Sequence, residues 1–414
     1  MEKLTHVAVY IQRDADREWL INSIAEGKLF GDEINLTTLK GEVYSSLTLQ
    51  RFINEELRHD HFEIDMGSGN ILSNSCSGEQ RKALLNYILK KKPGYIVLDN
   101  VFESLDIDAR ERILHRLEEL AKTTSLIQIL DRKRDLLPFI KTIYIVEHNI
   151  VTRQQTPQEF KPGITKQLFF GFTVPPPLHI FPPLQNPLVH MNNISVQFGE
   201  KRVLNNISWQ VNTGEFWQLK GPNGSGKSTI LSMITGDSPK AYGQDLSLFG
   251  HKKGSGETIW SIKEKIGYLT PTMIRDFERQ DSVEKMVVSG FYDSVGLYIK
   301  PSDRQLKLAD DWLRLIGMYE VRTQPFRLST PGQQRMVLIA RAMVKHPPLL
   351  ILDEPASGLD DEAAMLLTAL INKIAAETNT AIIYVSHMSE PGLTPQHVFE
   401  LKANPDGSSG HVVM

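Results

Sequence analysis

A glycine-rich segment in the second half of the chain has the residue types that bind phosphate. Residues 221–228 read Gly-Pro-Asn-Gly-Ser-Gly-Lys-Ser, which is the spacing G-x4-G-K-S. In such a loop the backbone N–H groups point inward around a phosphate, and the N-terminus of the following helix adds its dipole. We expect Lys227 to reach the terminal phosphates and the Ser228 hydroxyl to help hold Mg²⁺. The residues predicted to bind a nucleotide here are Gly221, Pro222, Asn223, Gly224, Ser225, Gly226, Lys227, Ser228 and Thr229.

Two adjacent carboxylates follow an apolar run later in the same half. The run 349–352 reads Leu-Leu-Ile-Leu, which is typical of a buried strand, and Asp353 and Glu354 come directly after it. In an open parallel sheet, ligands lie at the carboxyl ends of the strands. Asp353 is therefore expected to support Mg²⁺, directly or through water, and Glu354 to polarise the attacking water. An acidic pair after a strand is common, so this assignment depends on the phosphate loop.

His387 follows a second strand-like run, 381–385, and would reach the same sheet edge. There it could contact the γ-phosphate of a nucleotide, although an isolated histidine at a strand end is usually structural. Beside the phosphate loop and the acidic pair, we favour a catalytic role for His387 together with Glu354.

The elements that must position these residues alternate in type along the chain. Residues 216–219 read as the strand that enters the phosphate loop, and residues 229–234 as the helix that leaves it. In both halves, short apolar β-branched runs alternate with amphipathic helical stretches. This pattern is typical of α/β domains with a parallel sheet.

The order of motifs in the second half recurs in the first. Residues 77–81, Ser-Gly-Glu-Gln-Arg, precede a strand ending in Asp99, as residues 331–335, Pro-Gly-Gln-Gln-Arg, precede the strand ending in Asp353. Between the halves, prolines cluster where helix or ladder hydrogen bonding cannot continue. We therefore expect two copies of one domain. The predicted parts are a first domain at 1–154, a proline-rich linker at 155–188 and a second domain at 189–414.

These motifs and their order resemble those of the ATP-binding cassette (ABC) ATPases. The resemblance implies two tandem P-loop NTPase domains of the α/β class that use ATP and Mg²⁺. It also implies that Phe198 stacks on adenine, although by sequence alone an aromatic residue in a strand is more often part of the core. Residues 328–335, Leu-Ser-Thr-Pro-Gly-Gln-Gln-Arg, resemble the LSGGQ signature of the family, which offers a hydroxyl and N–H groups to a γ-phosphate held by the opposite cassette. The signature residues so implied are Ser329, Thr330, Gly332 and Gln333 in the second half, and Cys76, Ser77, Gly78 and Glu79 in the first.

The first half departs from the family pattern. Opposite the phosphate loop, residues 11–18 read Ile-Gln-Arg-Asp-Ala-Asp-Arg-Glu, without glycine and with Arg17 at the lysine position. The acidic pair becomes Asp99-Asn100, and Arg132 is expected where the second half has His387. Acidic side chains in the loop would repel a polyphosphate, and the early strands that contact adenine are missing. We therefore expect a truncated and degenerate first cassette that neither binds ATP in the usual way nor hydrolyses it.

The signature region of the first half is nevertheless partly intact. Because cassettes of this family pair head to tail, this region would complete the ATP site of the second half. Cys76 is expected at the position of the family serine, and a thiol is a weaker donor than a hydroxyl. The alternative interpretation is a relic helix start that is kept for packing.

Composition limits the classes of partner. The 414 residues carry a net charge of −3, so bulk charge does not favour nucleic acid. A single cysteine excludes an internal disulfide, and no apolar stretch is long enough to span a membrane. We therefore expect a cytoplasmic protein that meets the inner face of the plasma membrane only through a permease.

The leading functional hypothesis is an ABC-type ATPase with one working site, in which two cassettes of one chain, or of two chains, pair around ATP. The resemblance implies that it energises a molybdate-type transporter whose permease subunits are separate chains. Thr270-Pro271 stands where the family places a glutamine that couples the cassette to the membrane partner, which weakens this hypothesis. The alternatives are a soluble ATP-driven switch acting on ribosomes or damaged DNA, and a slow regulatory ATPase. The lack of a basic helical arm between the halves argues modestly against a ribosome binder.

Overall fold

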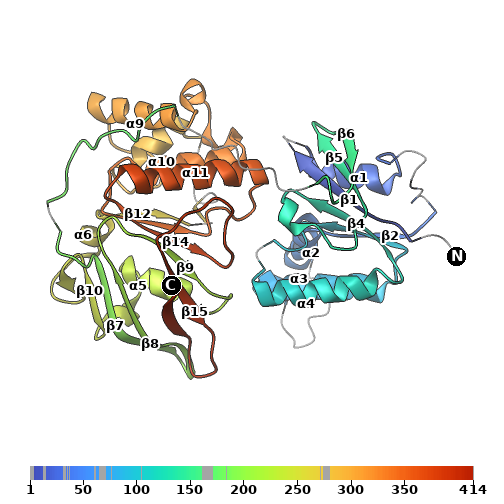
Figure 1. Cartoon of the computed structure of the whole chain (residues 1–414), viewed down its shortest axis with the longest axis horizontal. Coiled ribbons are helices and arrows are strands. Elements are labelled where there is room, and N and C mark those ends of the chain that lie inside the picture. The colour runs from blue at the N-terminus through green and yellow to red at the C-terminus, as the bar shows by residue number, and fades with distance from the viewer. Residues whose placement is uncertain are drawn as a thin grey trace. The chain divides into compact units, whose positions relative to one another are not determined.

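The computed structural model describes residues 4–12, 15–30, 34, 36, 38–59, 62–64, 71–75, 77–103, 105–160, 171–182, 184–270, 272–273 and 280–413. Contacts divide the chain into two compact units, unit 1 at 1–164 and unit 2 at 165–414, both drawn in Figure 1. The division falls inside the predicted linker, so the described residues 171–182 and 184–188 belong to unit 2.

Unit 2 is built on a six-stranded sheet of order β12-β13-β14-β9-β15-β16. Its neighbours pair in parallel, except that β16 runs antiparallel to β15. The central strands are continuous apolar runs, as expected for strands covered on both faces. The strands are β9 (Phe216–Lys220), β12 (Ile266–Leu269), β13 (Leu349–Asp353), β14 (Ala381–Ser386), β15 (His397–Lys402) and β16 (Ser409–Val413).

Alternate side chains of this sheet enter two different cores, because successive residues of a strand point to opposite faces. Leu350 and Leu352 pack against helices α8 to α11, whereas Leu349 and Ile351 pack on the face covered by α5 and by a four-stranded antiparallel sheet. Figure 1 shows α5 between the two sheets of unit 2. The helices are α5 (Lys227–Ile234), α6 (Ile259–Lys263), α8 (Val283–Ser289), α9 (Asp303–Leu315), α10 (Pro331–Met343) and α11 (Asp361–Glu377). The antiparallel strands are β7 (Val189–Phe198), β8 (Lys201–Val211), β10 (Asp245–Leu248) and β11 (His251–Lys252), and single 3-10 turns form η4 (Pro239–Ala241), η5 (Tyr319–Val321) and η6 (Phe326–Leu328).

Unit 1 has a six-stranded sheet of order β2-β3-β4-β1-β5-β6, in which β6 runs antiparallel to β5 and the other neighbours are parallel. The strands are β1 (His6–Gln12), β2 (Gly41–Tyr44), β3 (Tyr95–Asp99), β4 (Ser125–Leu130), β5 (Thr142–Glu147) and β6 (Ile150–Gln155). The helices are α1 (Arg17–Ala25), α2 (Ser46–His59), α3 (Ser77–Lys90) and α4 (Ile107–Leu120), with 3-10 turns at η2 (Leu72–Asn74) and η3 (Lys133–Asp135).

The two six-stranded sheets match strand by strand. Reading each from its first edge, β2, β3, β4, β1, β5 and β6 correspond to β12, β13, β14, β9, β15 and β16. The prediction of two tandem α/β domains of one type is therefore confirmed. On the face where unit 2 has its antiparallel sheet, the described part of unit 1 packs α1 with Phe30, Ile34 and Leu36 and contains no second sheet.

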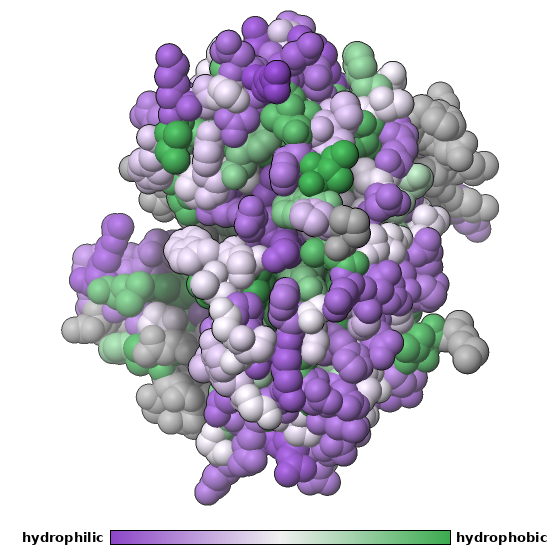
Figure 2. Space-filling view, turned by 90° about the vertical axis from the view of Figure 1, so that its left-hand side faces the viewer, coloured by the Kyte–Doolittle hydropathy of each residue, from purple (hydrophilic) through white to green (hydrophobic). Residues whose placement is uncertain are grey.

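The surface drawn in Figure 2 is mainly hydrophilic, with hydrophobic side chains in small groups. Among the described residues, no helix combines the length and the apolar composition that crossing a bilayer requires.

Candidate functional site

The phosphate loop of unit 2 joins β9 to α5 in a conformation that requires glycine. Gly224 has φ 77° and Gly226 has φ 92°, both in the left-handed region. A Cβ on Gly226 would lie 2.5 Å from Cδ2 of Leu204. Gly226 is also the N-cap of α5 and offers no side chain to the first turn. The N–H groups at the start of α5 are therefore available to an anion.

Polar groups inside the loop are poised for a ligand. The Lys227 ammonium is buried and donates to the carbonyls of Gly221, at 2.7 Å, and Pro222, at 3.0 Å. The Ser225 hydroxyl is fully buried and has no hydrogen-bond partner among the described residues. Ser228 lies exposed in the first turn of α5, followed by Thr229, and Asn223 is exposed at the tip of the loop. This donor set fits a polyphosphate with its Mg²⁺.

Asp353, Glu354 and His387 meet beside this loop. Asp353 ends β13 and pairs with Val385 of β14, so Glu354 and His387 leave neighbouring strands at the same edge. Nδ1 of His387 lies 3.4 Å from Oε1 of Glu354. Glu354 has φ 44°, which is strained for a residue with a side chain.

The electrostatics of the two carboxylates differ. Burial, and then the charge of Glu354, raise the pKa of Asp353 to about 6, while Lys227 opposes the shift. The hydrogen bond with His387 lowers the pKa of Glu354, and Lys227 contributes in the same direction. Since Lys227 acts on both groups, the structure brings the loop and the acidic pair together.

Phe198 ends β7 and is 49% exposed, so it is not a core residue. Nζ of Lys240 lies 5.6 Å from the centre of its ring. An exposed aromatic face can stack on a nucleobase. At the position of the coupling glutamine, the Thr270 hydroxyl lies 3.0 Å from that of Thr272, and Pro271 lies outside the described residues.

The signature residues of unit 2 form a helix cap. Thr330 is the N-cap of α10, and its hydroxyl accepts from the N–H of Gln333 at 3.3 Å, while Oε1 of Gln333 accepts from the N–H of Thr330 at 3.0 Å. This capping box occupies both side chains. Gly332 packs closely, since a Cβ there would lie 2.7 Å from Cβ of Ala363. Ser329, between η6 and the cap, keeps a hydroxyl that the cap does not use.

In unit 1 the signature segment has the same construction. Ser75 follows η2 as Ser329 follows η6, and α3 begins two residues later, as α10 does. Ser75 therefore corresponds to Ser329, because α3 and α10 begin at matching positions. Cys76 itself lies outside the described residues. Gly78 and Glu79 are exposed at the start of α3, and nothing is described of the side chain of Ser77.

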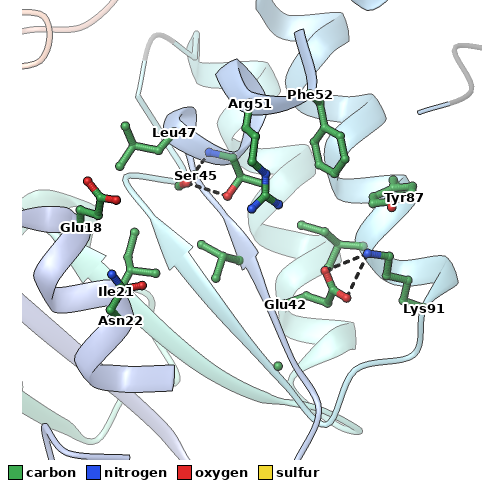
Figure 3. A pocket seen from close by; sticks show the side chains of 14 residues that line it. Glu18, Ile21, Asn22, Glu42, Ser45, Leu47, Arg51, Phe52, Tyr87 and Lys91 are labelled. Atoms are coloured by element: carbon green, nitrogen blue, oxygen red, sulfur yellow. Dashed lines mark hydrogen bonds and ion pairs between the residues drawn. The ribbon is translucent and has the colours of Figure 1, made fainter. Parts of the chain in front are cut away.

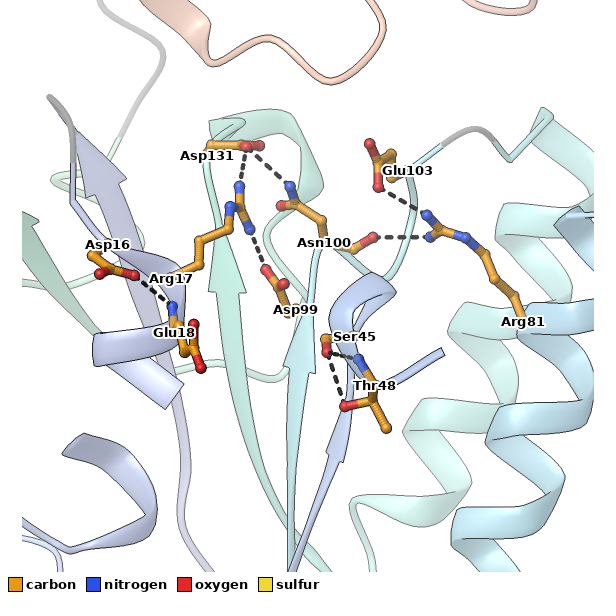
Figure 4. A network of polar contacts seen from close by, with 10 residues as sticks. All are labelled: Asp16, Arg17, Glu18, Ser45, Thr48, Arg81, Asp99, Asn100, Glu103 and Asp131. Carbon is orange, nitrogen blue, oxygen red and sulfur yellow. Dashed lines mark hydrogen bonds and ion pairs between the residues drawn. The ribbon is translucent and has the colours of Figure 1, made fainter. Parts of the chain in front are cut away.

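Unit 1 fills its phosphate position with its own side chains (Figure 4). Arg17 begins α1 as Lys227 begins α5. Its guanidinium forms one ion pair with Asp99 and a second with Asp131, at 2.5 Å, and the Asn100 amide also donates to Asp131, at 2.9 Å. In unit 1 the charge of Asp99, the counterpart of Asp353, is thus neutralised by Arg17 of the same unit.

The strand register corrects one sequence expectation. Asp99 pairs with Ile129 as Asp353 pairs with Val385, so Asp131 occupies the position of His387. The expectation of Arg132 there is wrong by one residue, because the register of β4 against β3 decides the position. Sequence reasoning did not identify Asp131. It directly follows β4 as His387 directly follows β14, so counting from the end of the strand in both halves would have identified it.

Asp16 closes the start of α1. It is the N-cap, and its carboxylate accepts from the N–H groups of Glu18, at 2.9 Å, and Trp19, at 3.2 Å. These correspond to N–H groups that the loop of unit 2 leaves open to an anion. The loop of unit 1 therefore needs no ligand.

A pocket of 520 Å³ opens beside the edge strand β2 of unit 1, with α1 on one side and α2 and α3 on the other (Figure 3). Lys91 there pairs with Glu42 at 3.1 Å and lies 4.3 Å from the centre of the Tyr87 ring. Ser45 on its wall is the counterpart of Thr270 by the register of β2 and β12. Sequence patterns did not reveal this pocket, because its lining comes from separate segments.

Comparison with known proteins places these motifs in one family. The family model "ABC transporter" matches residues 204–357. The chain is 39% identical to the ABC transporter ATP-binding protein ModF of Escherichia coli over 76% of this chain and 66% of that protein. It is 33% identical to the uncharacterized ABC transporter ATP-binding protein YlmA of Bacillus subtilis, over 49% of this chain and 77% of that protein.

A solved structure supports the fold. The RNase-L Inhibitor structure matches with a TM-score of 0.65 and 14% identity, over 98% of this chain and 85% of that chain. The chain spans 66% of the length of ModF and of a Schizosaccharomyces pombe relative that is 27% identical over 77% of this chain. The chain belongs to the ABC transporter ATP-binding proteins.

Proposed function

We propose that unit 2 binds and hydrolyses Mg·ATP and is the one working ATPase site of the chain. The observation that carries this proposal is the meeting of the loop 221–228 with Asp353, Glu354 and His387 at one sheet edge. The loop N–H groups and Lys227 would position the phosphates, and the exposed ring of Phe198 would stack on adenine.

Ser228 and Asp353 would hold Mg²⁺, which when bound neutralises charge on the phosphates. Glu354 would accept the proton of the attacking water, because its pKa is lowered and it is therefore ionised at neutral pH. His387, 3.4 Å from Glu354, would orient that carboxylate and contact the γ-phosphate.

The test of this proposal is Glu354→Gln. A glutamine keeps the shape of the side chain but cannot accept the proton, so turnover should fall about 10³-fold while ATP binding stays near that of the parent. Turnover would be followed by phosphate release and binding by calorimetry. Equal turnover in the variant and the parent would remove Glu354 from the mechanism.

For unit 1 we propose a role without nucleotide. Its phosphate position is filled by Arg17 and Asp16, whereas its signature segment keeps Ser75. That segment would serve a phosphate held by a competent cassette, in the same chain or in a second copy. Ser75 and Gly78 in unit 1, and Ser329 and Gly332 in unit 2, are the candidates for this contact.

The biological use that we favour is energising a molybdate-type transporter through separate permease subunits, at the inner face of the plasma membrane. Its support is the resemblance of the chain to transport cassettes. Thr270 at the coupling position favours a second candidate, a soluble switch acting on ribosomes or damaged DNA, or a slow regulatory ATPase. Partners captured by the Glu354→Gln variant in the presence of ATP, from membrane and soluble fractions, distinguish transport from a switch that acts on ribosomes or DNA. Recovery of a permease supports transport, and recovery of ribosomes or DNA with no permease opposes it.

A further inference from the structure

Glu56 is a buried carboxylate that the site described above does not use. It lies near the end of α2 and is 6% exposed. Its oxygens accept from the N–H of Leu72 at 3.1 Å, and from the N–H and hydroxyl of Ser73 at 3.5 and 3.3 Å. Within the part of the chain that the structure describes, no cation pairs with it. The carboxylate therefore depends on the donors of a single turn, η2.

The turn depends on Glu56 in return. The first N–H groups of a helical turn have no partner inside it, and a carboxylate is the acceptor that suits them. At the same turn, the Gln80 amide of α3 donates to the carbonyl of Leu72 at 2.8 Å. η2 is thus held between α2 and α3. Ser75 follows directly, and its hydroxyl donates to the carbonyl of Ile71, at 3.0 Å.

Unit 2 holds the equivalent turn differently. The N–H of Phe326 in η6 donates to the main-chain carbonyl of Asp281 at 2.9 Å, and Gln334 reaches the carbonyl of Phe326 at 3.4 Å. The glutamine contact is shared by both units. In unit 1, the side-chain carboxylate of Glu56 accepts from the first N–H of the turn, where unit 2 uses a main-chain carbonyl.

We infer that Glu56 is a positioning residue for the signature segment of unit 1. It fixes η2, and with it Ser75 and the start of α3, in a conformation that no nucleotide in unit 1 has to induce. A signature segment fixed in this way holds Ser75 in place before ATP binds, and its hydroxyl would turn from the carbonyl of Ile71 to a γ-phosphate. The consequence for catalysis rests on the proposed function, in which this segment completes a working ATP site.

The experiment compares Glu56→Ala, Glu56→Gln and the control Glu55→Ala, an exposed neighbour on the same helix, in the full chain. Glu56→Ala should lower kcat for ATP about tenfold. KM should stay within about twofold, because the loop that binds ATP lies in the other unit. Amide exchange at Leu72 and Ser73 should accelerate. Glu56→Gln keeps one oxygen acceptor and should recover most of both losses, and Glu55→Ala should match the parent.

Two results would overturn the inference. One is faster exchange at Leu72 and Ser73 in Glu56→Ala with kcat unchanged, which would show that a released turn has no effect on turnover. The other is unchanged exchange in folded Glu56→Ala, which would show that the carboxylate does not hold the turn. A parent chain that binds ATP without hydrolysing it would overturn the proposed function instead, and the exchange at these two amides would then decide the anchoring by itself.

Discussion

The loops before α5 and before α1 join equivalent strands and helices, yet they satisfy their polar groups in opposite ways. In unit 2 the N-cap Gly226 offers no side chain to the first turn of α5, the buried Ser225 hydroxyl has no hydrogen-bond partner among the described residues, and Lys227 donates to carbonyls of its own loop. In unit 1 Asp16 takes the N–H groups and Arg17 takes the carboxylates. Under the proposed function, a nucleotide would bind the polar groups of the first loop, whereas in the second loop it would have to displace side chains that already bind one another.

The two loops should respond most differently to the loss of their cation. Lys227→Ala should weaken ATP binding about 100-fold, because a charge-assisted contact to the phosphates is lost. Arg17→Ala should leave ATP affinity unchanged. Calorimetry measures both and should find one nucleotide per chain. Two bound nucleotides, or an ATP affinity that responds to Arg17, would show that unit 1 is not closed.

Arg17→Ala should instead destabilise unit 1. It leaves Asp99 and Asp131 buried without their cation, which costs about 3 kcal/mol of the free energy of unfolding. The matched control is Arg153→Ala on the exposed strand β6, whose partner Glu147, the last residue of β5, lies 3.6 Å away. That change should cost well under about 1 kcal/mol. Denaturant unfolding, read through amide exchange in β3, distinguishes the two. Similar losses would contradict the assigned role of the network.

The raised pKa of Asp353 should make the stability of the protein depend on pH. Burial raises the pKa of Asp353 in the folded protein to about 6, above the ordinary value of an aspartate, so the folded protein binds this proton more tightly than the unfolded chain. Its contribution to stability therefore rises as the pH falls from about 7 towards about 4. Asp353→Asn should stabilise the nucleotide-free protein by about 2 kcal/mol at pH 7.5 and by about half as much at pH 5.

The same titration should weaken Mg²⁺-dependent ATP binding below about pH 6, because the proton competes with the metal for the carboxylate. Melting temperatures of parent and Asp353→Asn at both pH values test the stability effect. A difference between parent and variant that does not change with pH would contradict the raised pKa.

The smallest effect concerns the cap of α1. Asp16→Ala removes the acceptor for Glu18 and Trp19 and should cost about 1 kcal/mol, whereas Asp16→Asn should cost little. ATP binding should be unchanged in both. Thermal unfolding compares them, and an equal loss for the two variants would show that the charge of Asp16, rather than its capping oxygen, is what matters.

How far the sequence predicts the structure depends on whether the signal is local. The spacing of Gly221, Lys227 and Ser228 and the strand ending in Asp353 are local, and the α/β fold and the twofold repeat follow from them. The position of Asp131 depends on the register of β4 against β3, which sequence counting placed one residue late. The partners of Glu56 come 16 and 17 residues later and have no local pattern.

The closed loop of unit 1 also limits the kinetics that one chain can show. With the single ATP site per chain that we propose, a lone chain has no second site with which to cooperate, so its rate should rise with ATP along a simple hyperbola. A Hill coefficient above one would then report that two chains act together. Because the side chain of Arg17 occupies the phosphate position of unit 1, the dependence of the ATPase rate on ATP concentration would also measure whether two chains assemble.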